Sequence, residues 1–183
     1  MLTIRPSGEQ IVQCSNTSRN DGVSYSYTFI YTYIHYLTLF NPLQSAYRKF
    51  HSTETVFLSL HDHLIHAVGQ QHVTCLCLLD LSAAFDTIDH TILLECSSQW
   101  FGVHGTVLTW FRSYLSDRSF CVKCSGELSQ PHHSCYSVPR GSVLGPLLFS
   151  LYTTPLRSLI SSFGLNHHLY ADDTQLFISF QAT

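Results

Sequence analysis

Two adjacent carboxylates, Asp172 and Asp173, interrupt an otherwise apolar stretch near the C-terminal end of this 183-residue chain. The residues on either side, 167–171 and 174–180, predict two β-strands joined by a tight turn. Because Asp is common in turns, a solvated hairpin is the simplest interpretation of the pair alone. The hairpin nevertheless constrains the fold strongly, since it brings two carboxylates to one end of a sheet.

A third carboxylate, Asp80, ends the apolar run of residues 73–79, which predicts a strand buried on both faces. Carboxylates gathered where buried strands end are costly unless a cation lies between them. Carboxylate oxygens suit hard divalent ions such as Mg²⁺, and two ions roughly 3.5–4 Å apart form the clamp used in phosphoryl transfer. Asp80, Asp172 and Asp173 therefore predict a site for two Mg²⁺ ions, with Mn²⁺ as an alternative. Because neighbouring strand residues point to opposite faces, only one aspartate of the pair is expected to join Asp80 fully.

Composition favours one globular domain, because 45% of the residues are hydrophobic and only 11% are charged. A net charge of −3, with nine Lys and Arg residues, means that a nucleic-acid partner would need basic surface from elsewhere. The N-terminus lacks the pattern of a secretory signal, and seven cysteines are an odd number. We therefore expect reduced thiols and an intracellular protein, in the nucleus or the cytoplasm.

Residues 1–40 differ from the rest of the chain. Residues 1–22 are polar and show no periodicity, whereas residues 24–29 alternate as a strand would. The Tyr, Thr and His residues between 23 and 40 make that stretch too polar to cross a membrane. We expect residues 1–40 to be an unassigned leader, β-prone or poorly ordered, and residues 41–183 to be the folded domain.

Within residues 41–183, helical and strand patterns alternate. Ser52 or Thr53 is expected to cap a helix that stops at Gly69. Further helices are expected at residues 91–100, 106–115 and 145–162, the last interrupted at Pro155. Residues 119–125 predict a strand with which residues 134–138 could pair. The expected apolar face of the first helix consists of Phe57, Leu60, Leu64, Ile65 and Val68.

Two further positions could contact a nucleotide. Phe85, on a turn after Asp80, could press on the sugar, and Gly141 allows close approach of the backbone to a ligand. Asp86 and Asp89 are interpreted as turn or capping residues.

Three of these segments resemble motifs of reverse transcriptases from non-LTR (LINE-type) retrotransposons. Residues 78–90 (LLDLSAAFDTIDH) resemble motif A, residues 138–149 (VPRGSVLGPLLF) motif B, and residues 170–173 (YADD) motif C. Residues 44–48 and 51–55 resemble the segment upstream of motif A, and residues 110–115 the helix between motifs A and B. Together the similarities cover residues 41–180, and three motifs in the same order are far more specific than each alone.

The resemblance implies an α+β fold, a right-hand polymerase palm of antiparallel strands backed by helices, with partial fingers and no thumb. It implies that Asp80, Asp172 and Asp173 are the catalytic aspartates and metal ligands, with Asp80 and Asp172 the more direct ones. Phe85 would disfavour a ribose 2′-hydroxyl. Arg140 and Gly141 would contact the substrate. The implied activity is RNA-directed DNA polymerisation, with an RNA template, a DNA primer and dNTPs as partners.

The sequence also departs from the family pattern. Arg140 stands where the family usually has Gln, and the upstream fingers strands and the thumb are not matched. These departures keep a second hypothesis open, a catalytically inactive retrotransposon remnant that retains at most residual nucleic-acid binding.

Two smaller hypotheses concern a second metal site and the solubility of the isolated chain. A Cys/His metal-binding module would use Cys121, Cys124, His132, His133 and Cys135. Apolar surface at Phe111, at Tyr114 and in the leader residues 25–36 would make the isolated chain poorly soluble and at best weakly active.

Overall fold

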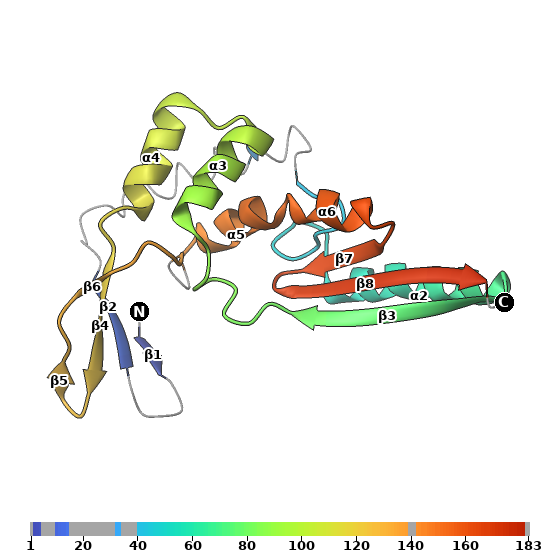
Figure 1. Ribbon diagram of the computed structural model, residues 1–183, viewed down its shortest axis with the longest axis horizontal. Coiled ribbons are helices and arrows are strands. Elements are labelled where there is room, and N and C mark those ends of the chain that lie inside the picture. The colour runs from blue at the N-terminus through green and yellow to red at the C-terminus, as the bar shows by residue number, and fades with distance from the viewer. Residues whose placement is uncertain (1, 5–9, 15–31, 34–39, 139–141, 182–183) are drawn as a thin grey trace. The chain divides into compact units, whose positions relative to one another are not determined.

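The computed structural model describes residues 2–4, 10–14, 32–33, 40–138 and 142–181 (Figure 1). The chain divides into two compact units. One unit comprises residues 39–84 and 153–183, and the other residues 1–38 and 85–152. The aspartates Asp80, Asp172 and Asp173 all belong to the first of these, which we call the hairpin unit; we call the second the helical unit.

The hairpin unit contains a three-stranded antiparallel sheet with the strand order β3-β8-β7. Its strands are β3 (His72–Asp80), β7 (Asn166–Tyr170) and β8 (Asp173–Gln181). β8 lies in the centre and pairs with β3 from Asp173 to Gln181. The predicted hairpin at the adjacent aspartates is therefore confirmed, and its second strand also carries the pairing with β3.

Helix α2 (Thr53–Gly69) runs along one face of this sheet (Figure 1). Its predicted cap is confirmed: the Ser52 hydroxyl accepts from Thr55 N, and the Thr55 hydroxyl accepts from Ser52 N. The His63 ring lies 4.5 Å from the ring of Phe177, between centroids, and its Nε2 lies 3.0 Å from Ser179 Oγ. These contacts show which face of the sheet α2 covers.

The predicted apolar face of α2 is largely wrong. Leu60 is buried as expected, but Phe57, Ile65 and Val68 are 65%, 58% and 73% exposed. Val56, Leu60 and Ala67 are the buried side chains, at spacings of four and seven residues. The stripe that meets the sheet includes His63, which contacts Ser179 of β8, and the more apolar stripe lies on the exposed side of the helix.

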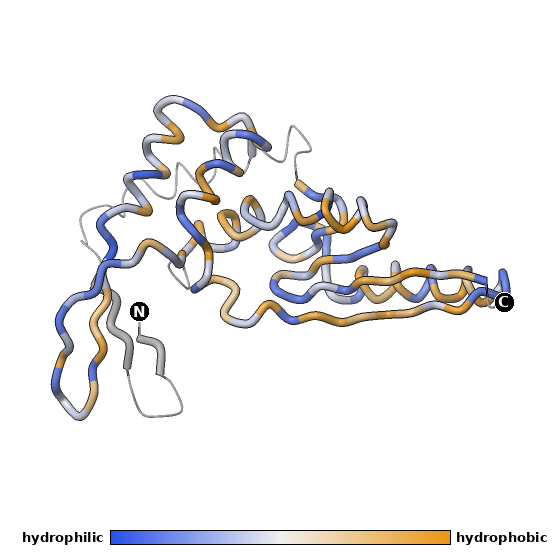
Figure 2. The backbone as a smooth tube through the Cα atoms, viewed as in Figure 1, coloured by the Kyte–Doolittle hydropathy of each residue, from blue (hydrophilic) through white to orange (hydrophobic). Residues whose placement is uncertain are grey.

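Strand β3 is not buried on both faces, contrary to expectation. Leu78, Val73 and Leu79 are 67%, 48% and 44% exposed. Figure 2 shows β3 as a nearly continuous hydrophobic strand. Among the described residues β3 pairs only with β8, so it is an edge strand, and its exposed side chains lie on both faces of the sheet. An apolar run indicates a need for burial but does not supply the elements that would cover it.

The outer edge of β7 is met by the segment before α2. Leu169 N donates to Leu43 O at 2.8 Å, and Ser45 N donates to Leu169 O at 2.9 Å. The Arg48 guanidinium donates to the carbonyls of Asn41 and Gln44 at 3.0 and 3.2 Å, which holds this segment in a compact turn. Helix α6 (Leu156–Ser162) precedes β7 and packs near it.

The helical unit carries a second sheet with the order β1-β2-β4-β5, in which β6 also pairs with β4. Its strands are β1 (Leu2–Ile4), β2 (Gln10–Cys14), β4 (Ser119–Cys124), β5 (Glu127–Leu128) and β6 (His132–His133). The sequence of residues 1–22 shows no strand periodicity, yet two short strands, β1 and β2, form within it. β2 pairs with β4, a partner distant in the chain. The strand expected at 24–29 lies outside the described residues.

The prediction that residues 134–138 pair with β4 is wrong. β6 pairs with Ser119 and Phe120 instead. Residues 135–138 bond to the segment before α3: Val138 N donates to Phe85 O at 3.0 Å, and Ser137 N donates to Ile88 O at 2.8 Å. This long-range pairing has no local sequence signal.

The predicted helices of this unit are confirmed as α3 (His90–Phe101), α4 (Gly105–Leu115) and α5 (Gly145–Thr153). The Asp89 carboxylate caps α3 by accepting from Thr91 N and Ile92 N, so its capping role is confirmed. Phe111 is fully buried with Phe101 and Phe149 in the core, so its expected exposure is wrong. Among the described residues, no helix is long and apolar enough to cross a membrane.

Candidate functional site

The turn between β7 and β8 consists of Ala171 and Asp172, because Tyr170 and Asp173 are the last paired residues. Ala171 has φ +53°, a conformation uncommon for a residue with a Cβ. Two-residue hairpin turns need a positive φ to match the twist of the strands, which explains this backbone. The turn places Asp172 at its tip, partly exposed, and begins β8 at Asp173.

Asp80 and Asp173 lie directly opposite each other in the pairing of β3 with β8. One position further, Leu81 N donates to Asp172 O at 3.1 Å. Hydrogen-bonded and non-hydrogen-bonded pairs alternate in an antiparallel ladder, so Asp80 and Asp173 form a non-hydrogen-bonded pair with Cα atoms about 4.5 Å apart. Both carboxylates therefore project from the same face at the closest spacing that a sheet offers.

That face is the one covered by α2. Side chains alternate along a strand, so Asp173 shares its face with Phe177 and Ser179, which contact His63 of α2. Asp80 and Asp173 are exposed, and Asp172 is half-buried. Sequence reasoning paired Asp80 with Asp172, whereas the strand register makes Asp173 the direct neighbour of Asp80.

The candidate ligands Asp80, Asp172 and Asp173 are carboxylates at one end of one sheet, and carboxylate oxygens suit a hard divalent cation. The side chains themselves are not gathered: within the described part of the chain, no group of three His, Cys, Asp or Glu residues could hold a metal ion. A shared ion would therefore require the carboxylates of Asp80, Asp172 and Asp173 to turn toward one another.

Tyr47 is a neighbour of this site that sequence reasoning missed. Burial raises the pKa of its hydroxyl, and the nearby Asp172 and Tyr170 raise it further. Tyr47 belongs to the segment that is bonded to β7 through Leu43 and Ser45. Its place in the segment upstream of motif A was the signal that could have identified it.

Three polar side chains link that segment to β7. Ser45 Oγ lies 2.8 Å from His168 Nε2 and 3.1 Å from His51 Nδ1. Burial is the main cause that lowers the pKa of His168 and of His51. His167 and His51 lower the pKa of His168 further, and Arg48 lowers that of His51. Neutral imidazoles therefore join the segment to the strand that leads to Asp172.

The remaining predicted site residues belong to the helical unit or lie outside the described residues. Phe85 is half-buried and stacks on Phe149, with ring centroids 5.0 Å apart, and its carbonyl accepts from Val138 N. The beginning of motif B therefore lies beside the end of motif A. Arg140 and Gly141 lie outside the described residues.

The structure does not form the Cys/His module. Cys121 is buried, Cys124 and Cys135 are exposed, and the six cysteines whose side chains are described are free thiols. His132 packs on Phe120, with ring centroids 5.9 Å apart. No three of the five proposed ligands, all described, are gathered to hold a metal ion.

Comparisons with known proteins agree with the motifs. The profile of the family described as "Reverse transcriptase (RNA-dependent DNA polymerase)" matches residues 28–182. The chain is 33% identical over 115 residues to the "Probable RNA-directed DNA polymerase from transposon BS" of Drosophila melanogaster, a match that covers 62% of this chain and 12% of that protein.

Two further relatives from Drosophila melanogaster are similar. Identity is 30% over 115 residues with the "Probable RNA-directed DNA polymerase from transposon X-element", covering 60% of this chain and 12% of that protein. It is 28% over 136 residues with the "RNA-directed DNA polymerase from mobile element jockey", covering 72% of this chain and 15% of that protein. The matches thus span 12 to 15% of the length of these relatives. Because the family profile matches most of the sequence, the chain belongs to the reverse transcriptase (RNA-dependent DNA polymerase) family.

Proposed function

We propose that this chain forms the palm core, with partial fingers, of an RNA-directed DNA polymerase that transfers a dNTP to a primer 3′-hydroxyl. The observation that carries the proposal is the register of β3 with β8, which sets Asp80 opposite Asp173 beside the turn at Asp172. An antiparallel sheet with α2 on one face is the kind of scaffold that a palm requires. Membership of the reverse transcriptase family supports the reaction type.

The three aspartates have distinct places in this proposal. Asp80 and Asp173 form the like-charged pair that a cation would neutralise, and Asp172 at the turn would complete the ligand set. Two bound Mg²⁺ ions, or Mn²⁺, supply activation of the attacking 3′-hydroxyl and stabilisation of the leaving oxygen. The chain's own contribution is to hold the carboxylates on one rigid sheet end so that the reacting groups can be positioned.

Residues of the helical unit would contact the substrate. Phe85 stacks on Phe149, which limits the motion of its ring. In this position the ring would contact the deoxyribose of the bound nucleotide and exclude a ribose 2′-hydroxyl. Arg140 and Gly141 would lie against the nucleotide or the template and primer. With nine basic residues and a net charge of −3, binding of the RNA template and DNA primer would depend on basic surface supplied by other parts of the polymerase.

Primer extension on an RNA template with Mg²⁺ tests the proposal. We expect template-dependent incorporation that is lost in Asp80→Asn, Asp172→Asn and Asp173→Asn and retained in Asp117→Asn. Asp117 is a suitable control because it is an exposed aspartate of the other unit, and its φ of +54° suits Asn equally well.

Two results would reject the polymerase. One is synthesis that persists in the Asp172→Asn variant, which would place the chemistry elsewhere. The other is the absence of any template-dependent synthesis by the wild-type chain even at low salt and high template concentration, where the shortage of basic residues limits binding least; this result would favour the inactive remnant.

A further inference from the structure

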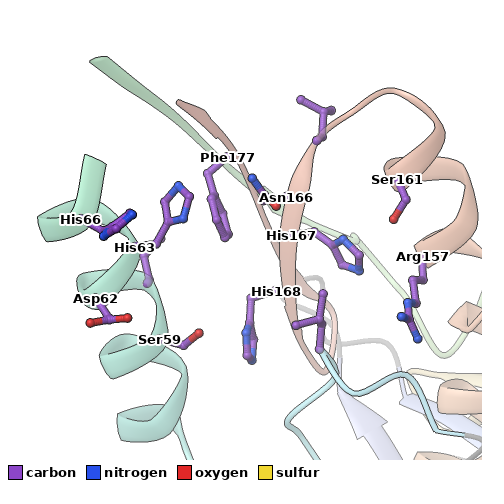
Figure 3. A pocket seen from close by; sticks show the side chains of 13 residues that line it. Ser59, Asp62, His63, His66, Arg157, Ser161, Asn166, His167, His168 and Phe177 are labelled. Atoms are coloured by element: carbon purple, nitrogen blue, oxygen red, sulfur yellow. The ribbon is translucent and has the colours of Figure 1, made fainter. Parts of the chain in front are cut away.

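The hairpin unit contains a cavity of about 420 Å³ between α2, α6 and the outer edge of β7 (Figure 3). This volume is in the usual range for small-molecule sites. The cavity is distinct from the aspartate site, because none of Asp80, Asp172 and Asp173 lines it.

His167 is the side chain in this cavity that most needs a partner. It is only 3% exposed, yet its Nε2 has no hydrogen-bond partner among the described residues. A buried polar atom without a partner carries a free-energy cost. A ligand that bonds to Nε2 would remove this cost.

Charge around His167 is unevenly distributed. Arg157 of α6 acts on the imidazole electrostatically: burial, and then the Arg157 charge, lower the pKa of His167. Figure 3 shows Arg157, Ser161 and His167 on one side of β7, whereas Asp62, His63 and His66 lie across the strand on α2. The half of the cavity beside α6 is therefore cationic, and the Asp62 carboxylate is separated from it by the strand.

This arrangement selects against cations and for anions. Within the described residues no three His, Cys, Asp or Glu side chains could hold a metal ion, in spite of the several histidines here. A guanidinium binds phosphate oxygens with two parallel hydrogen bonds. The Ser161 hydroxyl and the His167 imidazole are further groups that can donate to an oxyanion.

We propose that the α6 half of this cavity binds a phosphate oxyanion through Arg157, His167 and Ser161. Arg157 supplies the charge and the bidentate contact. His167 Nε2 supplies the buried donor that has no partner among the residues that the structure describes, and Ser161 supplies a hydroxyl. The phosphate can come from an inorganic ion, a nucleoside triphosphate or a nucleic-acid backbone, which share this chemistry.

Titration calorimetry of the full chain tests the site with inorganic phosphate, a deoxynucleoside triphosphate without metal, and a single-stranded oligonucleotide. We expect Arg157→Gln to weaken binding of at least one probe about tenfold or more, as loss of a charge-assisted contact predicts. Arg157 is exposed, so the variant is expected to unfold at the wild-type denaturant midpoint. The matched control is Arg112→Gln on α4, which removes the same charge from the helical unit.

Nitrogen NMR of the histidine side chains gives a readout specific to the cavity. Addition of the bound probe is expected to shift the His167 Nε2 resonance in the wild-type protein and not in Arg157→Gln. The probe that binds identifies the source of the phosphate. Equal weakening by Arg157→Gln and Arg112→Gln, no binding of any probe, or an unmoved His167 resonance on binding would overturn the proposal. None of these measurements depends on polymerase activity.

Discussion

Asp80 and Asp173 face each other across two antiparallel strands, at the pairing position next to the hydrogen bond from Leu81 N to Asp172 O. The two residues are separated by about half of the sequence, yet the register makes them the closest cross-strand neighbours at this end of the sheet. Like charges in this position repel, so the protein gives up stability where the proposed chemistry needs negative charge. Several expectations follow from this relationship and from the packing around it.

Replacement of Asp173 by Asn is expected to stabilise the metal-free protein while it removes polymerase activity. The change removes the repulsion from Asp80, which is worth up to about 0.5 kcal/mol for an exposed cross-strand pair. Urea denaturation at low salt measures the gain, which is expected to shrink in high salt because of screening. Asp117→Asn serves as the control. A loss of stability in Asp173→Asn would mean that the carboxylate makes favourable contacts instead.

Stability is expected to fall as the pH is lowered through the range of free histidine. Burial lowers the pKa values of His51, His167 and His168 below the ordinary value of 6.5. The unfolded chain therefore binds more protons than the folded one below about pH 6.5, and the free energy of unfolding rises with pH there. Denaturation between pH 5 and pH 8 measures this slope, which His168→Gln should reduce. A flat profile would contradict the neutral state of these imidazoles.

Ser45 is expected to contribute to stability through its hydroxyl. Ser45→Ala removes the partner of His168 Nε2 and of His51 Nδ1, and leaves a buried imidazole nitrogen unsatisfied. The expected cost is about 1–3 kcal/mol in the free energy of unfolding. Ser158→Ala, on the exposed side of α6, is the control and should change stability by less than about 0.5 kcal/mol. Equal stability of the two variants would show that the hydroxyl is dispensable.

The two apolar stripes of α2 are expected to respond differently to truncation. Leu60→Ala opens a cavity against the sheet and should cost about 2–3 kcal/mol. Phe57→Ala, although it removes a larger side chain, should cost less than about 0.5 kcal/mol, because Phe57 is 65% exposed. Chemical denaturation of both variants measures the difference. The reverse order would show that the stripe with Phe57 is covered in solution.

The exposed apolar side chains and the edge of β3 are expected to make the isolated chain self-associate. Val73 and its cross-strand partner Phe180 are 48% and 49% exposed, and an exposed apolar edge strand is a template for pairing with other chains. Val73→Lys lies at the opposite end of β3 from Asp80, so it should raise the monomer fraction in size-exclusion chromatography without changing the aspartate site. A wild-type chain that remains monomeric at high concentration would refute this expectation.

Local sequence determined the helices α2 to α5, the hairpin of β7 and β8, and the position of the candidate site. The turn at Ala171 and Asp172, the cap at Ser52 and the cap at Asp89 depend on side chains within a few residues of the backbone groups that they satisfy, so their patterns could be read directly. The order of the motifs also identified the family, because three short segments in sequence are specific even when each alone is weak.

Tertiary structure alone decided which surfaces are covered. The α2 stripe that meets the sheet, the edge position of β3 and the pairing of residues 135–138 with the segment before α3 all depend on partners distant in the chain. Whether Asp172 or Asp173 lies opposite Asp80 is likewise a question of register, and a shift of one residue would exchange the two. Periodicity shows that a residue can be buried, but the element that buries it is chosen by packing across the whole unit.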